Sequence, residues 1–161
     1  METLLQELTH GLHDRQQIAR VLIRLLAAMI LGGLIGIQRE RTGKPAGFRT
    51  HMMVCLGTAV FVISCSGVGM AFDAMSRVIQ GLVTGIGFIG AGTILKLDQE
   101  EQIKGLTTAA GIWMTAAIGI TAALGAIGIA LMATVLALII LTVAQPFEDF
   151  MQKRRDQKPK R

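Results

Sequence analysis

The sequence GGLIGIQRERTGKPAGFRTH, residues 32–51, changes character twice. It begins apolar and rich in glycine, then places four cations and one anion between Arg39 and Arg49, and after His51 the chain is apolar again. A helix that leaves a bilayer, makes a short basic turn and re-enters produces this pattern, because the hydrocarbon region excludes charge and the headgroup region accepts it. We therefore expect a turn between two membrane-spanning helices here.

The composition of the whole chain favours a helical membrane protein. Of its 161 residues, 52% are hydrophobic and 17% are charged, with a single Trp and no Tyr. Apolar content at this level, with few charges, is typical of membrane helices. The cations occur in blocks between apolar runs and are not interleaved with aromatic residues, so nucleic-acid binding is not expected.

The apolar runs predict an all-α integral membrane fold. The last uncharged run, residues 107–144, has 38 residues, which is about right for two spans of ~18 residues with a reversal at residues 124–126. Residues 73–77 are expected to form a turn and residues 96–104 a polar loop. The membrane domain, residues 21–144, is expected to have five transmembrane helices: 21–37, 52–72, 78–95, 107–123 and 126–144.

The two ends of the chain flank this domain. Residues 1–20 carry leucines at helical spacing and predict a short amphipathic helix outside the cytoplasm. Residues 145–161 form a basic tail, expected to lie on lipid headgroups or to bind a partner. With five spans, twelve Lys and Arg fall on one side and three on the other, which predicts an outside N-terminus and a cytoplasmic C-terminus.

Small residues recur at four-residue spacing within several spans. Such stripes usually allow close helix packing, within one chain or between copies. A second interpretation is that the glycine-rich helices line a path for a substrate. The glycines concerned are Gly32, Gly36, Gly81, Gly85, Gly90, Gly92, Gly111 and Gly119.

Charged residues within the membrane region are few. Arg24 lies inside the first span, and we expect it to extend to the outer interface, with a buried pair to Asp73 as the alternative. No Asp or Glu lies inside the spans, and the chain has no Walker motif, nucleophile elbow or Cys/His cluster at metal-binding spacing. We therefore expect no enzymatic activity, no cofactor and no bound metal. A dedicated Mg²⁺ carrier is disfavoured, although glycine-rich helices could offer backbone carbonyls to an ion.

Four blocks of the sequence resemble the MgtC/SapB family of bacterial inner-membrane proteins. They are GGLIGIQRER (32–41), AGFRT (46–50), GIGFIGAGTIL (85–95) and KGLTTAAGIW (104–113), in family order and spacing. The resemblance implies a five-span protein of the bacterial inner membrane, linked to growth in low magnesium, acid stress and survival of pathogens in host cells. Some members are labelled magnesium-transport ATPase proteins, but no ATPase motif occurs here. Longer members continue into an ACT-like domain, so the resemblance is to a short form.

The resemblance also implies an activity and a set of residues. Family members bind and modulate other membrane proteins, so our first hypothesis is a non-enzymatic modulator whose partners are the bilayer, another membrane protein and a second copy of itself. The alternative is a small oligomeric transporter or channel for Mg²⁺ or H⁺, and a third idea is a structural scaffold. The basic residues could equally be topology anchors only. The candidates for a functional cytoplasmic face are Arg39, Glu40, Arg41, Arg49, Thr50, Lys104, Thr107 and Thr108.

Overall fold

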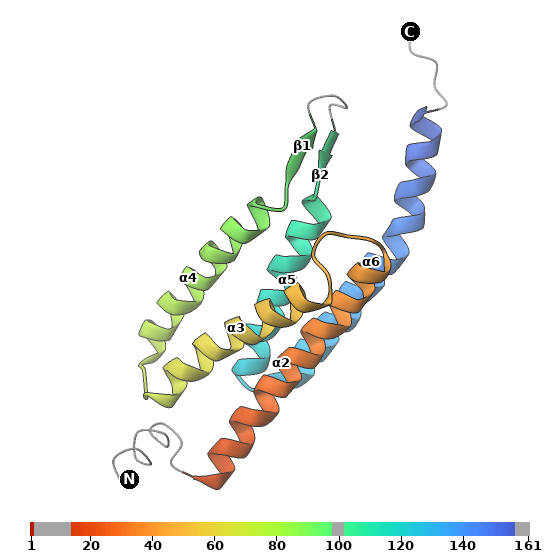
Figure 1. Ribbon diagram of the computed structural model, residues 1–161. Coiled ribbons are helices and arrows are strands. Elements are labelled where there is room, and N and C mark those ends of the chain that lie inside the picture. Colours follow the sequence, from red (N-terminus) through yellow and green to blue (C-terminus); the bar gives the residue numbers. More distant parts are fainter. Residues whose placement is uncertain (2–13, 98–101, 157–161) are drawn as a thin grey trace.

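The computed structural model describes residue 1, residues 14–97 and residues 102–156, and this part of the chain is a helical bundle with one short hairpin (Figure 1). Helices α2 to α5 are long and apolar enough to cross a membrane, and the apolar stretch of α6 is Ile127–Val143. The elements in chain order are α2 (Arg15–Arg41), α3 (Phe48–Gly67), α4 (Phe72–Ala91), β1 (Leu95–Leu97), β2 (Gln102–Lys104), α5 (Leu106–Ala123) and α6 (Ile127–Asp156).

The helices differ from the expected spans at their ends. Residues 15–20, expected in the N-terminal amphipathic segment, belong to α2, and the rest of that predicted helix, residues 2–13, lies outside the described part. The expected turn at residues 73–77 is wrong, because these residues form the start of α4. Asp73 stabilises that start, since a carboxylate suits the positive end of a helix. The chain instead reverses just before α4, where Gly69 takes a left-handed φ of 68°.

Two other connections can be compared with their predicted forms. The region expected to be a polar loop contains an antiparallel pair in which Leu95 lies opposite Lys104 and Leu97 opposite Gln102. The reversal predicted at residues 124–126 is confirmed, and Gly125 allows it with a left-handed φ of 88°.

Helix α5 lies at the centre of the bundle. It contacts α2, α3, α4 and α6, and most of its residues are buried. Its high content of Ala, Gly and Thr allows four neighbours to approach, because small side chains keep helix axes close. Helix α4 lies at the edge, with only Ile86 and Gly90 buried among its residues.

Three of the glycines lie where another backbone passes close by. A Cβ atom at Gly32 would lie 2.7 Å from the His51 carbonyl oxygen, and one at Gly36 would lie 2.6 Å from the Phe48 Cα atom. A Cβ atom at Gly119 would collide with the Cys55 carbonyl group. These contacts join α2 and α5 closely to α3, so no side chain larger than hydrogen fits at these glycines without movement.

Candidate functional site

The turn between α2 and α3 is closed by its own backbone. Gly43, with a left-handed φ of 67°, follows the C-cap residue Thr42. The Lys44 N–H donates to the Arg39 carbonyl and the Gly43 N–H to the Glu40 carbonyl, both at 3.0 Å. This pair of bonds is the Schellman arrangement, which ends a helix and reverses the chain. The predicted basic turn therefore has a fixed backbone shape.

Glu40 joins the end of α2 to the start of α3. Gly47, the N-cap residue of α3, has no side chain to cap the helix, and the Phe48 N–H instead donates to Glu40 Oε2 at 2.8 Å. A Cβ atom at Gly47 would lie 2.8 Å from that same oxygen, so glycine makes room for the carboxylate. An anion at a helix N-terminus is favourable, because it complements the exposed N–H groups and the helix dipole.

Arg39 is buried within the bundle. Its side chain is 2% exposed, and Nη2 donates to Thr108 Oγ1 on α5 at 3.1 Å. Arg39 and Thr108, two of the candidates for the cytoplasmic face, are both buried where α2 meets α5. A buried cation among membrane helices is costly and usually marks a structural or functional centre.

His51 of α3 makes a second buried polar contact with α5. It is fully buried, and its Nδ1 atom lies 2.7 Å from Thr115 Oγ1. Thr115 in turn donates to the Gly111 carbonyl at 2.8 Å, and the imidazole ring lies against Gly111. Two buried polar pairs, Arg39 with Thr108 and His51 with Thr115, therefore join α5 to α2 and to α3.

His51 is absent from the site residues predicted from the sequence. A usable signal was present, because His51, Cys55 and Thr58 lie on one face of a helix that is otherwise apolar. Polar residues at this spacing point to a buried polar contact. All three are indeed buried.

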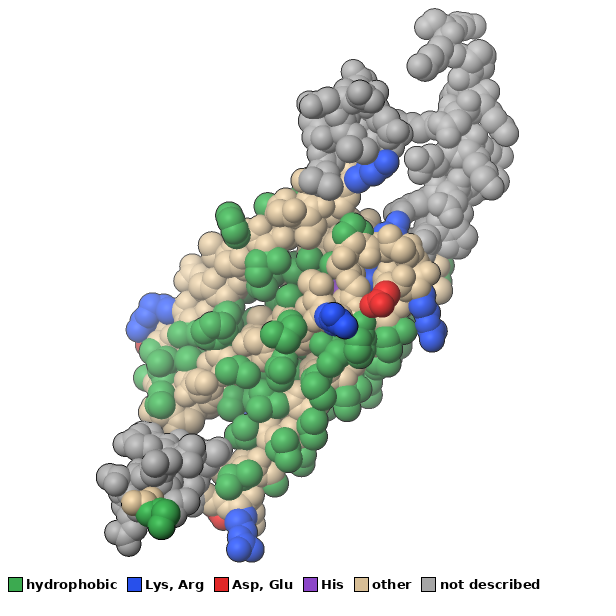
Figure 2. Space-filling view, viewed as in Figure 1, with side chains coloured by type: hydrophobic (Ala, Val, Ile, Leu, Met, Phe, Trp, Pro, Cys, Tyr) green, Lys and Arg blue, Asp and Glu red, His purple; other side chains and the backbone are tan. Residues whose placement is uncertain are grey.

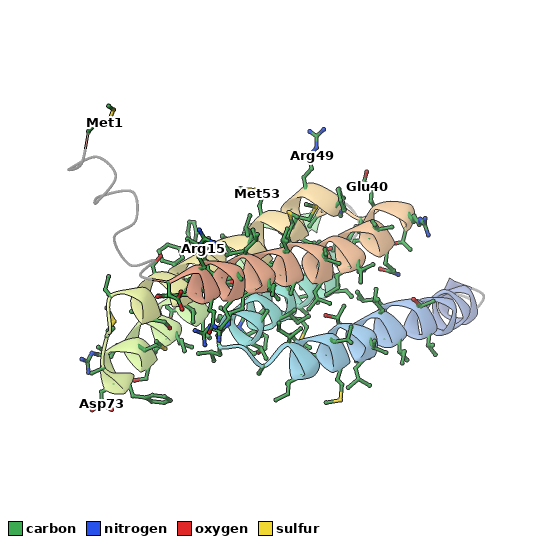
Figure 3. The ribbon with its side chains drawn as sticks, turned by 90° about the horizontal axis from the view of Figure 1, so that it is seen from below. Met1, Arg15, Glu40, Arg49, Met53 and Asp73 are labelled. Atoms are coloured by element: carbon green, nitrogen blue, oxygen red, sulfur yellow. The ribbon has the colours of Figure 1, made fainter. Side chains whose placement is uncertain are left out.

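The remaining face candidates are exposed. They comprise Glu40, Arg41, Arg49, Thr50, Lys104 and Thr107. A hollow of about 670 Å³ opens at the turn between α2 and α3, and is lined by Glu40, Lys44, Pro45, Gly47, Phe48, Arg49 and Thr50. Figure 2 shows basic and acidic side chains at this end of the bundle beside a largely hydrophobic surface. In Figure 3, Glu40 and Arg49 project on the same side of the molecule.

Arg24 lies at the other end of α2. It is half-buried, and its Nη1 donates to the Ala123 carbonyl at 2.9 Å. Ala123 is the last residue of α5, so this cation satisfies a terminal carbonyl at the negative end of the helix. Asp73 is exposed, so the alternative of a buried pair between Arg24 and Asp73 is wrong.

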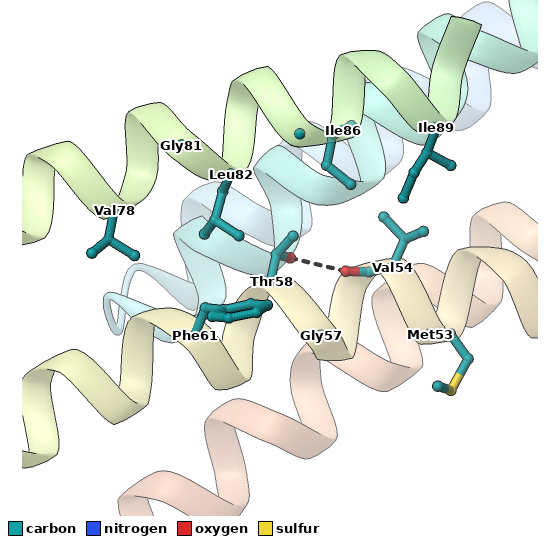
Figure 4. Close-up of a pocket in the computed structure, with 11 residues that line it drawn as sticks. Met53, Val54, Gly57, Thr58, Phe61, Val78, Gly81, Leu82, Ile86 and Ile89 are labelled. Carbon is teal, nitrogen blue, oxygen red and sulfur yellow. Dashed lines mark hydrogen bonds between the residues drawn. The ribbon is translucent and has the colours of Figure 1, made fainter. Parts of the chain in front are cut away.

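A second hollow, a groove of about 650 Å³, separates α3 from α4 (Figure 4). Gly81 and Gly85 line it, and a Cβ atom at either position would meet nothing within 4 Å. Gly90 lies instead against Ala109 of α5, and Gly92 ends α4. Within the described residues, no group of three or more His, Cys, Asp or Glu side chains is placed to hold a metal ion.

Comparison with known proteins identifies one matching family and several relatives. The profile described as the MgtC family matches residues 25–150. Protein SrpB of Synechococcus elongatus is 42% identical over 74% of this chain and 71% of its own length. "Putative magnesium transporter YhiD" of Escherichia coli is 43% identical over 78% of this chain and 60% of its own length. Protein MgtC of Salmonella typhimurium is 39% identical over 79% of this chain and 53% of its own length.

The chain therefore spans little more than half the length of the last relative, and no solved structure gives a significant match. The profile match covers well over half of the 161 residues. The chain is a multi-pass membrane protein that belongs to the MgtC family.

Proposed function

We propose that this chain is a non-enzymatic protein of the bacterial inner membrane that modulates a membrane partner or ion homeostasis when magnesium is limiting. Under this proposal it crosses the membrane five times, with the N-terminus outside and the C-terminus in the cytoplasm. The same modulating function would also operate under acid stress and during survival inside host cells. Support comes from the family membership and from the magnesium-related name of the relative YhiD.

The observation that carries the proposal is the buried hydrogen bond between Arg39 and Thr108. It ties the end of α2 to the first turn of α5. Exposed Arg41 follows Arg39 by two residues, and exposed Thr107 directly precedes Thr108. The bond therefore holds two separate polar segments at one end of the bundle. A surface that is already ordered suits docking, because little conformational entropy is lost on binding.

The proposal can be tested by complementation under magnesium limitation. A strain lacking this gene would be supplied with the wild-type chain, with Arg41→Glu, or with Arg15→Glu as a control. Both arginines are exposed, and both variants change the charge by the same amount. They differ in position, because the two arginines lie at opposite ends of α2. We expect Arg41→Glu to lose complementation and Arg15→Glu to keep it. Equal growth with both variants, at equal amounts in the membrane, would refute docking through this end.

A second candidate function is a small oligomeric transporter or channel for Mg²⁺ or H⁺. It is favoured by the groove between α3 and α4, where Gly81 and Gly85 leave open space. Flux of each ion would be followed in liposomes holding the wild-type chain, Gly85→Leu or Gly128→Leu. Gly128 is exposed on α6 and also has nothing within 4 Å, so it is a matched control. Saturable flux that Gly85→Leu abolishes and Gly128→Leu keeps would favour transport over modulation. No flux from inserted wild-type protein would exclude the transport function.

A further inference from the structure

The polar hollow and the apolar groove lie along one face of α3. Arg49 lines the hollow and Met53, one turn along, lines the groove. Thr50 and Gly57 repeat this relationship at a spacing of seven residues. Residues four and seven apart share a face of a helix. Figure 3 shows Glu40, Arg49 and Met53 on the same side of the molecule. A ligand with a charged head and an apolar tail would match this sequence of surfaces.

The hollow holds two cations and one fixed carboxylate. Lys44 and Arg49 are exposed, and neither forms an ion pair within the described residues. Glu40 is held in place by the Phe48 N–H through its Oε2 atom. Guanidinium and ammonium groups are the usual partners of phosphate oxygens. A carboxylate fixed beside them would repel a purely anionic ligand, so its presence favours a ligand that also carries a positive charge.

The groove next to the hollow offers only apolar contact. Its walls include Met53, Phe61 and Leu82, and Gly57, Gly81 and Gly85 leave open space (Figure 4). The one hydroxyl in its lining, that of Thr58, donates to backbone carbonyls of its own helix. Its volume of about 650 Å³ is in the range of small-molecule sites, ~300–1,000 Å³. A hydrocarbon chain fits such a surface without leaving a polar group unpaired.

We propose that these two hollows form one binding site for an amine-bearing membrane phospholipid. Lys44 and Arg49 bind its phosphate, Glu40 binds its headgroup ammonium, and one acyl chain lies in the groove between α3 and α4. This assignment uses each charge of the hollow and explains why the groove glycines face no protein atom. It does not depend on whether the chain modulates a partner or transports an ion.

The test measures lipid retention on the full chain. Protein purified in detergent would be incubated with equimolar phosphatidylethanolamine, phosphatidylglycerol and phosphatidylcholine, and bound lipid would be counted by native mass spectrometry. We expect phosphatidylethanolamine to be retained most strongly. The double variant Lys44→Ala/Arg49→Ala should weaken its binding about 25-fold, from two phosphate contacts each worth about fivefold. The control Arg15→Ala/Arg20→Ala removes two exposed cations from the start of α2 and should change nothing.

Two further variants separate the parts of the site. Glu40→Gln keeps an oxygen for the Phe48 N–H but removes the charge, so it should abolish the preference for phosphatidylethanolamine over phosphatidylglycerol. Gly85→Leu should fill the groove and reduce retention of both, whereas Gly128→Leu should not. Glycerophosphoethanolamine, which has the headgroup but no acyl chains, should compete only weakly. Circular dichroism and gel filtration would confirm that every variant is folded.

Several results would overturn the proposal. Equal retention of the three lipids by the wild-type chain would mean nonspecific lipid only. A preference for phosphatidylglycerol would show that the site binds an anionic lipid and not the proposed amine-bearing one. Strong competition by glycerophosphoethanolamine, or normal retention by folded Gly85→Leu, would remove the groove from the site. A dimer whose cross-links cover the groove while no lipid is bound would make a second copy the occupant.

Discussion

Replacing Gly36 by alanine is expected to destabilise the bundle, whereas the same change at Gly81 is not. A Cβ atom at Gly36 would lie 2.6 Å from the Phe48 Cα atom and 3.0 Å from the Gly47 carbonyl oxygen. These are backbone atoms, so the clash cannot be relieved by a change of rotamer. Overpacking of this kind costs about 1–3 kcal/mol. At Gly81 the added methyl group meets nothing within 4 Å, and alanine improves helix propensity by up to ~1 kcal/mol.

The assay is reversible unfolding of the purified protein in mixed micelles, followed by far-ultraviolet circular dichroism. The two variants have the same chemical change on helices of the same bundle, so micelle effects common to both cancel. Both glycines lie inside helices, so the propensity gain of alanine is common to the two variants and cancels in the comparison. We expect the free energy of unfolding of Gly36→Ala to lie about 1–3 kcal/mol below that of Gly81→Ala, which is the overpacking cost alone. A Gly36→Ala protein as stable as Gly81→Ala would refute the close contact between α2 and α3.

Two further predictions concern the buried and capping contacts. Thr108→Val removes the hydroxyl that accepts from Arg39 and should destabilise the protein by about 1–3 kcal/mol. The same change at the exposed neighbour, Thr107→Val, should leave the free energy of unfolding unchanged. Equal unfolding free energies for the two variants would contradict the buried bond. Glu40→Ala removes the acceptor for the Phe48 N–H and should cost about 0.5–2 kcal/mol, while Glu40→Gln should cost less, and hydrogen exchange of that amide would show whether the cap is lost.

The local sequence predicted some features of the turn between α2 and α3 but not their partners. Arg39, Glu40 and Arg49 all appeared as similar charges in one basic turn. In the structure Arg39 is buried, Glu40 caps α3 and Arg49 lines an exposed hollow. The three environments differ because the three side chains leave their helices in different directions. Arg39 meets a hydroxyl 69 residues away, which no local pattern reveals.

The glycines illustrate the same limit. Gly32 with Gly36 and Gly81 with Gly85 have the same four-residue spacing. The first pair lies against the backbone of α3, and the second pair faces an open groove. Spacing places residues on one face of a helix, but it cannot show whether another helix covers that face.

The linear pattern was sufficient for the all-helical fold and the reversal at residues 124–126, because transfer of apolar and charged segments into a bilayer depends on local composition. The family followed from the resemblance of four sequence blocks. The orientation and the count of five spans stay predictions. Three hydrogen-bonded contacts join residues 64 to 99 positions apart in the chain. They are Arg39 with Thr108, His51 with Thr115, and Arg24 with the end of α5. Such contacts follow from how the helices pack around α5, and packing depends on the shapes of all the helices together.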